Sequence, residues 1–139
     1  MTTKSDATPK SAPRTRGRNV LAVASGKGGV GKTWFSITLT HAMVLEGHKA
    51  LLFDGDLGLA NIDIQLGLMP KHDLGGVIAG RISLKDAITK FPDGGFDIIA
   101  GRSGSGSLAN LPATRLQALS DDLIQTGKSY DKVLIDLGA

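Results

Sequence analysis

The sequence predicts an α/β fold in which a parallel β-sheet carries helices on both faces. Short apolar segments alternate with longer segments whose apolar residues recur at helical spacing. A glycine-rich loop joins the first apolar segment to the first helical one. This order is typical of right-handed βαβ units, which pack helices against both faces of a parallel sheet.

Strands and helices can be placed along most of the chain. We expect strands at 19–25, 49–53, 96–100 and 132–137. We expect helices at 33–46, within 57–68, and at 74–79, 83–90 and 112–127. Gly47 follows the first helix where a left-handed residue often ends one, Gly80 separates two short helices, and Ser83 can cap the second of these. The loops that follow parallel strands should converge at one edge of the sheet.

The glycine-rich loop is the most informative segment. Residues 25–33 read Ser-Gly-Lys-Gly-Gly-Val-Gly-Lys-Thr and fit G-x-x-x-x-G-K-[ST], the pattern of a P-loop NTPase. The glycines let successive backbone N–H groups point at phosphate oxygens, and the following helix adds its partial positive charge. Lys32 would contact the β- and γ-phosphates, and Thr33 would offer a hydroxyl to Mg²⁺. The residues expected at the nucleotide are Gly26, Lys27, Gly28, Gly29, Val30, Gly31, Lys32 and Thr33.

An ordinary phosphate-binding loop does not need a lysine at the position of Lys27. Two later segments of the sequence help to interpret it. The first runs Asp54-Gly-Asp56-Leu-Gly-Leu-Ala-Asn61-Ile-Asp-Ile-Gln-Leu-Gly-Leu68, after an expected strand. The second is Tyr130-Asp-Lys-Val-Leu-Ile-Asp136-Leu-Gly-Ala139. With the loop, they resemble the MinD/ParA family of deviant Walker A ATPases over residues 19–139, and most of all its MinD/FlhG (FleN) branch.

The resemblance implies ATP and Mg²⁺ as cofactors and hydrolysis of ATP to ADP and phosphate as the reaction. Lys32 would neutralise phosphate charge. Thr33 and Asp136 would form the metal site, with Asp136 acting through water because Mg²⁺ keeps several of its waters.

The resemblance also implies roles for four residues around the phosphates. Asp56 would orient the attacking water, and Asp54 would either support it or be a turn residue at the strand end. Asn61 would belong to a switch segment or only cap a helix. Lys27 would reach across a nucleotide-sandwich homodimer to the partner's phosphates, and a lone chain would hydrolyse ATP slowly. Lys27, Lys32 and Asp56 are thus the expected catalytic residues.

Charge divides the chain into two parts. The net charge of the whole chain is +3. Residues 1–18 hold five basic residues and one acidic residue, so they carry +4 and residues 19–139 carry −1. We expect a disordered basic tail at 1–18 and the N-terminal part of an ATPase domain at 19–139. A domain without a basic excess does not favour DNA binding.

Composition narrows the class further. Apolar residues make up 41% of the chain and charged residues 21%, as expected of a cytoplasmic domain. Cysteine is absent, which excludes disulfides and cysteine metal sites in this sequence. His41, His48 and His72 lack metal-ligand spacing, and Trp34 is expected to pack within its helix.

Length suggests a fragment, because members of the family are usually nearly twice as long. The remaining part would complete the sheet and carry the adenine pocket and a helix that targets the inner face of the membrane. This fragment alone would then be a weak ATPase or inactive.

The sequence as a whole predicts an ATP-dependent dimerisation switch of the MinD/FlhG type, acting in flagellar placement or number or at the division site. A protein partner would stimulate its turnover. Three alternatives remain open: a ParA-like partitioning ATPase, which needs a basic face, an iron–sulfur carrier, which needs cysteines, and a small-molecule ligase, which leaves Lys27 unexplained.

Overall fold

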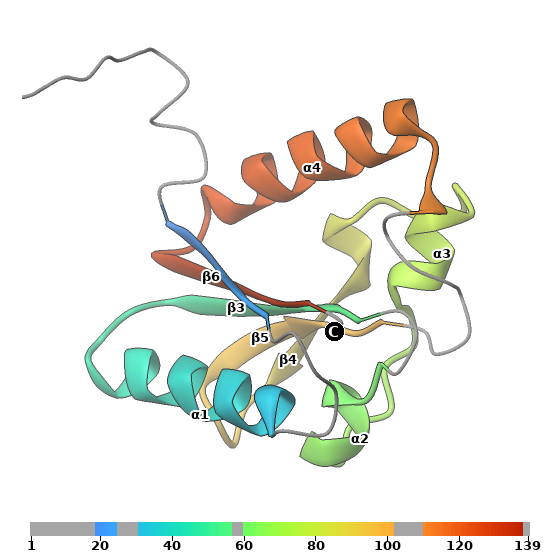
Figure 1. Ribbon diagram of the computed structural model, residues 1–139. Helices are drawn as coiled ribbons and strands as arrows, with labels where there is room; N and C mark the ends of the chain where they lie inside the picture. The colour runs from blue at the N-terminus through green and yellow to red at the C-terminus, as the bar shows by residue number, and fades with distance from the viewer. Residues whose placement is uncertain (1–18, 25–30, 57–59, 102–109, 138–139) are drawn as a thin grey trace, which may run out of the picture.

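The computed structural model describes residues 19–24, 31–56, 60–101 and 110–137, and the expected tail at 1–18 lies outside them. In this part of the chain one β-sheet lies between two layers of helices (Figure 1). Helices α1 and α2 cover one face, and α3 and α4 cover the other. The predicted α/β architecture with helices on both faces is therefore confirmed.

The described residues form the following strands and helices. The strands are β2 (Val20–Val23), β3 (Ala50–Gly55), β4 (Ile88–Phe91), β5 (Phe96–Ile99) and β6 (Lys132–Leu137). The helices are α1 (Lys32–Leu45), α2 (Ile62–Leu66), α3 (Leu74–Ile78), the 3₁₀ turn η2 (Lys85–Ala87) and α4 (Ala113–Gly127). Gly47, after α1, has φ 92°, as its predicted left-handed position requires.

The strands lie in the order β2-β6-β3-β5-β4. Every neighbouring pair among β2, β6, β3 and β5 is parallel. The carboxyl ends of these four strands therefore share one edge, which we call the C-edge. The sheet brings Asp54 on β3 directly opposite Asp136 on β6 at this edge.

Alternate residues of the central strand face opposite helical layers. Leu51 and Phe53 of β3 join the core under α3 and α4, while Leu52 joins the core over α1 and α2. All three side chains are at most 1% exposed. An apolar run with both faces buried is typical of a central parallel strand, which explains why β3 reads as a continuous apolar segment.

One predicted element is wrong. Residues 83–90 do not form a helix, because only η2 is helical and β4 follows it at once, pairing antiparallel with β5. Ser83 Oγ accepts a hydrogen bond from Asp86 N–H at 3.3 Å, so the expected cap closes a single turn. The β-branched and aromatic residues Ile88, Thr89 and Phe91 favour a strand.

A glycine pair makes the β4–β5 hairpin possible. Gly95 has φ 74°, and a Cβ on Gly94 would come within 2.7 Å of the rings of Phe91 and Phe96. These rings pack edge to face with their centroids 5.3 Å apart. The antiparallel edge strand thus depends on a tight turn that helical periodicity does not reveal.

Asp54 ties the end of β3 to the start of α2. Its side chain is 1% exposed, and its two carboxylate oxygens accept hydrogen bonds from the N–H groups of Asp56 and Ile62, each at 3.2 Å. Asn61 occupies the N-cap position of α2 but makes no side-chain capping bond. Asp54 therefore does the capping expected of Asn61. Burial raises the pKa of Asp54 to about 6, although the two hydrogen bonds lower it.

This pKa predicts a pH-dependent stability. Because the pKa of Asp54 is raised from its ordinary value of 3.8 to about 6 in the folded protein, folding favours the protonated carboxyl. Its stabilising effect is full below the unfolded pKa and is lost as pH rises through the folded pKa. Urea unfolding should show the stability of wild type relative to Asp54→Asn falling by about 2–3 kcal/mol between pH 4 and pH 7.5. A difference that stays constant over this range would contradict the assignment.

Candidate functional site

Asp136 is the centre of the candidate site. It lies near the end of β6 at the C-edge, is 1% exposed, and pairs in register with Val23 of β2 and Asp54 of β3. The first turn of α1 packs against it. A carboxylate at this depth needs compensating donors, because burying an unpaired charge costs several kcal/mol.

Three side chains from the start of α1 provide those donors. Asp136 Oδ1 lies 2.6 Å from Lys32 Nζ and accepts a hydrogen bond from Ser36 Oγ at 2.9 Å. Asp136 Oδ2 accepts a hydrogen bond from Thr33 Oγ1 at 2.8 Å. The Lys32 side chain is only 9% exposed. The structure therefore brings Lys32, Thr33 and Asp136 together at the C-edge, where the loops after the parallel strands were expected to converge.

Sequence reasoning missed Ser36. It is 0% exposed and stands one turn after Lys32, whose carbonyl also accepts a hydrogen bond from its hydroxyl at 3.1 Å. Thr40 repeats the pattern one turn further, donating to the Ser36 carbonyl at 2.7 Å. The available signal was the spacing of Lys32, Ser36 and Thr40, which places polar groups on one buried stripe of an apolar helix.

The start of α1 has the geometry of an anion site. Gly31 precedes the helix with φ 83°, a conformation that favours glycine. As the N-cap residue it has no side chain to bond the first N–H groups of the helix. The first N–H groups of a helix lack partners within the helix and carry partial positive charge. Gly26, Lys27, Gly28, Gly29 and Val30 lie outside the described residues.

Asp54, within β3, and Asp56, which follows it, differ in burial and in their hydrogen bonds. Asp54 is buried and holds backbone N–H groups through both oxygens. Asp56 is partly exposed, and its N–H is the group that Asp54 holds. Asn61 is also partly exposed. The carboxylate of Asp54 thus fixes the backbone on which Asp56 stands.

A second residue escaped prediction at this edge. A Cβ on Gly101, directly after β5, would come within 2.8 Å of Ala60 Cβ and 3.0 Å of the Asp54 carbonyl oxygen. The chain leaving β5 therefore packs directly on the segment that carries Asp54.

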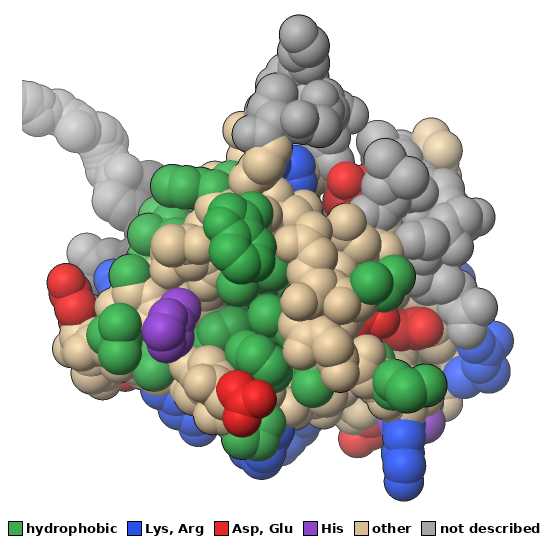
Figure 2. Space-filling view, turned by 90° about the horizontal axis from the view of Figure 1, so that it is seen from below, with side chains coloured by type: hydrophobic (Ala, Val, Ile, Leu, Met, Phe, Trp, Pro, Cys, Tyr) green, Lys and Arg blue, Asp and Glu red, His purple; other side chains and the backbone are tan. Residues whose placement is uncertain are grey.

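Trp34 does not pack within α1 as expected. Its side chain is 64% exposed, and its neighbour Phe35 is 56% exposed. Figure 2, which views the molecule from the side of α1 and α2, shows hydrophobic side chains gathered on this face. Helical periodicity does not reveal which faces of a helix remain uncovered by the rest of the fold.

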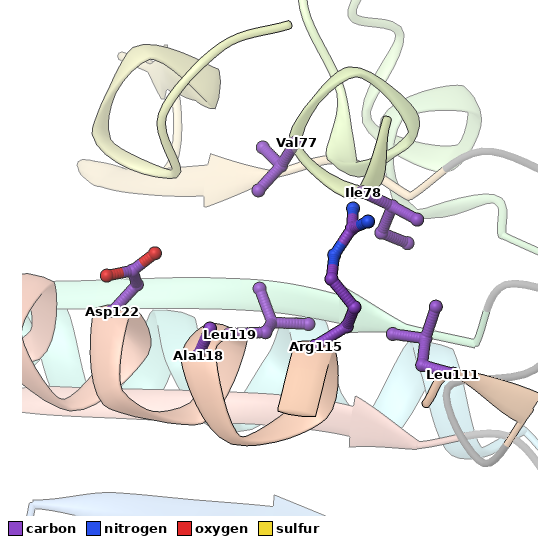
Figure 3. Close-up of a pocket in the computed structure, with 7 residues that line it drawn as sticks. All are labelled: Val77, Ile78, Leu111, Arg115, Ala118, Leu119 and Asp122. Atoms are coloured by element: carbon purple, nitrogen blue, oxygen red, sulfur yellow. The ribbon is translucent and has the colours of Figure 1, made fainter. Parts of the chain in front are cut away.

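A cavity between α3 and α4 is too small for a nucleotide. It encloses about 70 Å³, and Arg115 reaches from α4 toward Ile78 of α3 across it (Figure 3). Sites for small ligands usually enclose about 300–1,000 Å³. The described residues contain no cluster of three His, Cys, Asp or Glu side chains able to hold a metal. None of the described helices is both long and apolar enough to span a bilayer.

Comparisons with known proteins identify a family and several relatives of this chain. The CobQ/CobB/MinD/ParA nucleotide binding domain matches residues 21–137. The antiactivator FleN of Pseudomonas aeruginosa is 40% identical over 120 residues, which are 86% of this chain and 42% of FleN. The flagellum site-determining protein YlxH of Helicobacter pylori is 32% identical over 121 residues, 86% of this chain and 40% of YlxH.

A solved structure shows the same likeness. The septum site-determining protein MinD of Pyrococcus horikoshii, complexed with Mg-ADP, superposes with a TM-score of 0.68 at 29% identity. The match covers 85% of this chain and 48% of that one. The chain thus spans less than half the length of these relatives. The family model matches most of the chain, and the two relatives each match 86% of it. The chain therefore belongs to the CobQ/CobB/MinD/ParA nucleotide-binding domain family, as its resemblance to the MinD/FlhG branch indicated.

Proposed function

We propose that the chain binds Mg-ATP at residues 26–33 and hydrolyses it as a dimerisation switch in spatial organisation, such as flagellar number or placement or the choice of division site. The observation that carries this proposal is the placement of Lys32 and Thr33 against Asp136 at the C-edge. One relative is a flagellum site-determining protein by name, another is named an antiactivator, and the MinD structure holds Mg-ADP. These likenesses support nucleotide-dependent regulation.

The residues at Asp136 fit a magnesium nucleotide. Thr33 and Asp136 offer hard oxygen ligands, which Mg²⁺ prefers, and Asp136 would act through water. Lys32 Nζ stands beside them and can exchange its contact with Asp136 for phosphate oxygens when a nucleotide binds. Mg²⁺ would neutralise charge on the phosphates. Asp136 thus holds the lysine and the threonine in place until the ligand arrives.

Asp56 is the proposed water-positioning residue. Its backbone is held by Asp54, so the side chain stands on a fixed support at the C-edge. Loss of the supporting bond would move Asp56 without removing it. Asn61, at the start of α2, is the proposed switch residue of the same segment.

Lys27 is proposed to act in trans, contacting the phosphates of the partner copy in an ATP-bound homodimer, much as an arginine finger does. A protein partner that stimulates turnover completes the proposed cycle. DNA is a poorer candidate partner, because residues 19–139 carry a net charge of −1.

Lys32→Ala should abolish Mg-ATP binding in the whole protein, because the glycine loop alone leaves phosphate charge uncompensated. Isothermal titration calorimetry measures this directly. Since the variant leaves Asp136 buried without its cation, Lys32→Ala/Asp136→Asn provides a second, charge-balanced variant that should fold and still not bind. Exposed Lys71→Ala is the matched control. Wild-type affinity in a folded Lys32 variant would remove the nucleotide assignment.

Asp56→Ala should leave ATP binding intact or tighter, because it removes a negative charge near an anionic ligand. Loss of a positioning or general-base contact typically slows the chemical step by about 10²–10⁴-fold. The variant should accumulate as an ATP-bound dimer, measured by phosphate release and by size-exclusion chromatography with ATP. Asp93→Ala, an exposed aspartate in the β4–β5 turn, is the control. Turnover at the wild-type rate in Asp56→Ala would reject the catalytic role.

A further inference from the structure

An open cleft lies away from the proposed nucleotide site, beside the edge of the sheet where β3 and β5 begin and α4 ends. It encloses about 480 Å³, within the usual size range of small-molecule sites. In Figure 1, α4 ends on the side of the molecule opposite the C-edge, and the cleft lies beside that end of the helix. Asp136 and the side chains that contact it lie at the C-edge, at the other end of the strands, so the cleft is separate from them.

The cleft is lined mainly by hydrogen-bond donors. Lys49, Lys85 and Lys90 line the cleft from three different segments, and the Lys90 side chain is 83% exposed. The end of α4 and the turn after it add an amide and two hydroxyls, from Gln125, Thr126 and Ser129. The side chains of Ile88 and Tyr130 give the cleft an apolar part.

One carboxylate lies among these donors, and it is already engaged. Tyr130 donates its phenolic hydrogen to Asp97 Oδ2 at 2.6 Å, and Lys90 Nζ lies 4.0 Å from Asp97 Oδ1. Burial, the hydrogen bond and the charge of Asp97 raise the pKa of Tyr130, so the phenol remains a donor. Lys49 Nζ lies 5.1 Å from the centre of the Tyr130 ring. Three lysines against one aspartate leave the cleft positive although residues 19–139 are net negative.

The negative end of α4 explains only part of this charge. A helix C-terminus attracts cations within its last turn. The Asn19 amide already donates to the carbonyl oxygens of Gly127 and Tyr130, each at 2.9 Å, which partly satisfies this end. Lys85 and Lys90 reach the cleft from η2 and β4, across the space from α4. A bound anion would account for lysines on both sides of the cleft.

We propose that this cleft binds a small molecule that carries phosphoryl groups. The three lysines supply the charge, since lysine is a common phosphate binder. The amide and hydroxyls donate to phosphate oxygens, and Ile88 contacts the less polar part of the molecule. This site does not depend on the proposed nucleotide site, so either proposal can fail without the other.

Amide NMR of the whole protein, titrated with inorganic pyrophosphate at low salt without Mg²⁺, distinguishes the two sites. Binding at the cleft should shift the signals of Gln125, Thr126, Ser129 and Tyr130 in a saturable way and should weaken as salt rises. Binding at the phosphate loop shifts the amides at the start of α1 instead. The absence of saturable shifts at the cleft up to about 10 mM pyrophosphate, the affinity range of weak ligands, overturns the proposal.

Variants of opposite sign test the charge argument. Lys85→Gln/Lys90→Gln should weaken pyrophosphate binding at the cleft by about fivefold, and Asp97→Asn should tighten it by about twofold or more. The amide oxygen of the Asp97→Asn variant can still accept the Tyr130 hydrogen bond, so the cleft keeps its shape. Lys71→Gln/Arg81→Gln removes the same charge from exposed positions elsewhere and should change affinity much less.

Two results would contradict the proposal even if anions bind. Equal weakening by the control pair would show a general charge effect, with the lysines only solvated at the end of α4. Saturation of the cleft amides by a short poly-glutamate peptide at lower concentration than by pyrophosphate would assign the surface to an acidic protein segment.

Discussion

The buried carboxylate of Asp136 is the constraint on which the rest of this structure depends. At 1% exposure it requires donors, and Lys32, Thr33 and Ser36 provide them from one turn and a half of α1. Removing one partner of a buried ion pair typically costs about 3–5 kcal/mol, because the other charge remains buried. The pairing therefore joins helix to sheet and sets the start of α1 at the carboxyl end of β6, where a phosphate can reach it.

Strands β3 and β5, which follow β6 in the sheet, contribute different contacts at the same edge. Asp54, opposite Asp136 in register, uses its oxygens for backbone N–H groups and thereby holds the segment that carries Asp56. Gly101 lets the chain after β5 approach the same segment. Two buried aspartates in register thus make different contacts: Asp136 holds side chains of α1, and Asp54 holds backbone N–H groups at the end of β3 and the start of α2.

The sequence predicted the long elements and the convergence of the motifs, but not the contacts between them. Strand β3 and helices α1 and α4 have patterns long enough to be unambiguous, whereas Ile88–Phe91 is short and its strand character depends on the turn at Gly94 and Gly95. The exposure of Trp34 and the burial of Ser36 depend on which face of α1 the sheet covers. The capping of α2 by Asp54 instead of Asn61 is a tertiary contact that local patterns do not contain. The roles of Lys27 and the glycine loop remain predictions.

The most direct test of the central claim is the Mg²⁺ dependence of ATP affinity in wild type and Asp136→Asn, measured by calorimetry with Mg²⁺ and with EDTA. If Asp136 holds Lys32 until the nucleotide binds and then completes the metal site, the variant keeps its affinity for metal-free ATP, because Lys32 is released. It should also lose most of the affinity that Mg²⁺ adds in wild type. An equal gain from Mg²⁺ in both proteins would contradict the account.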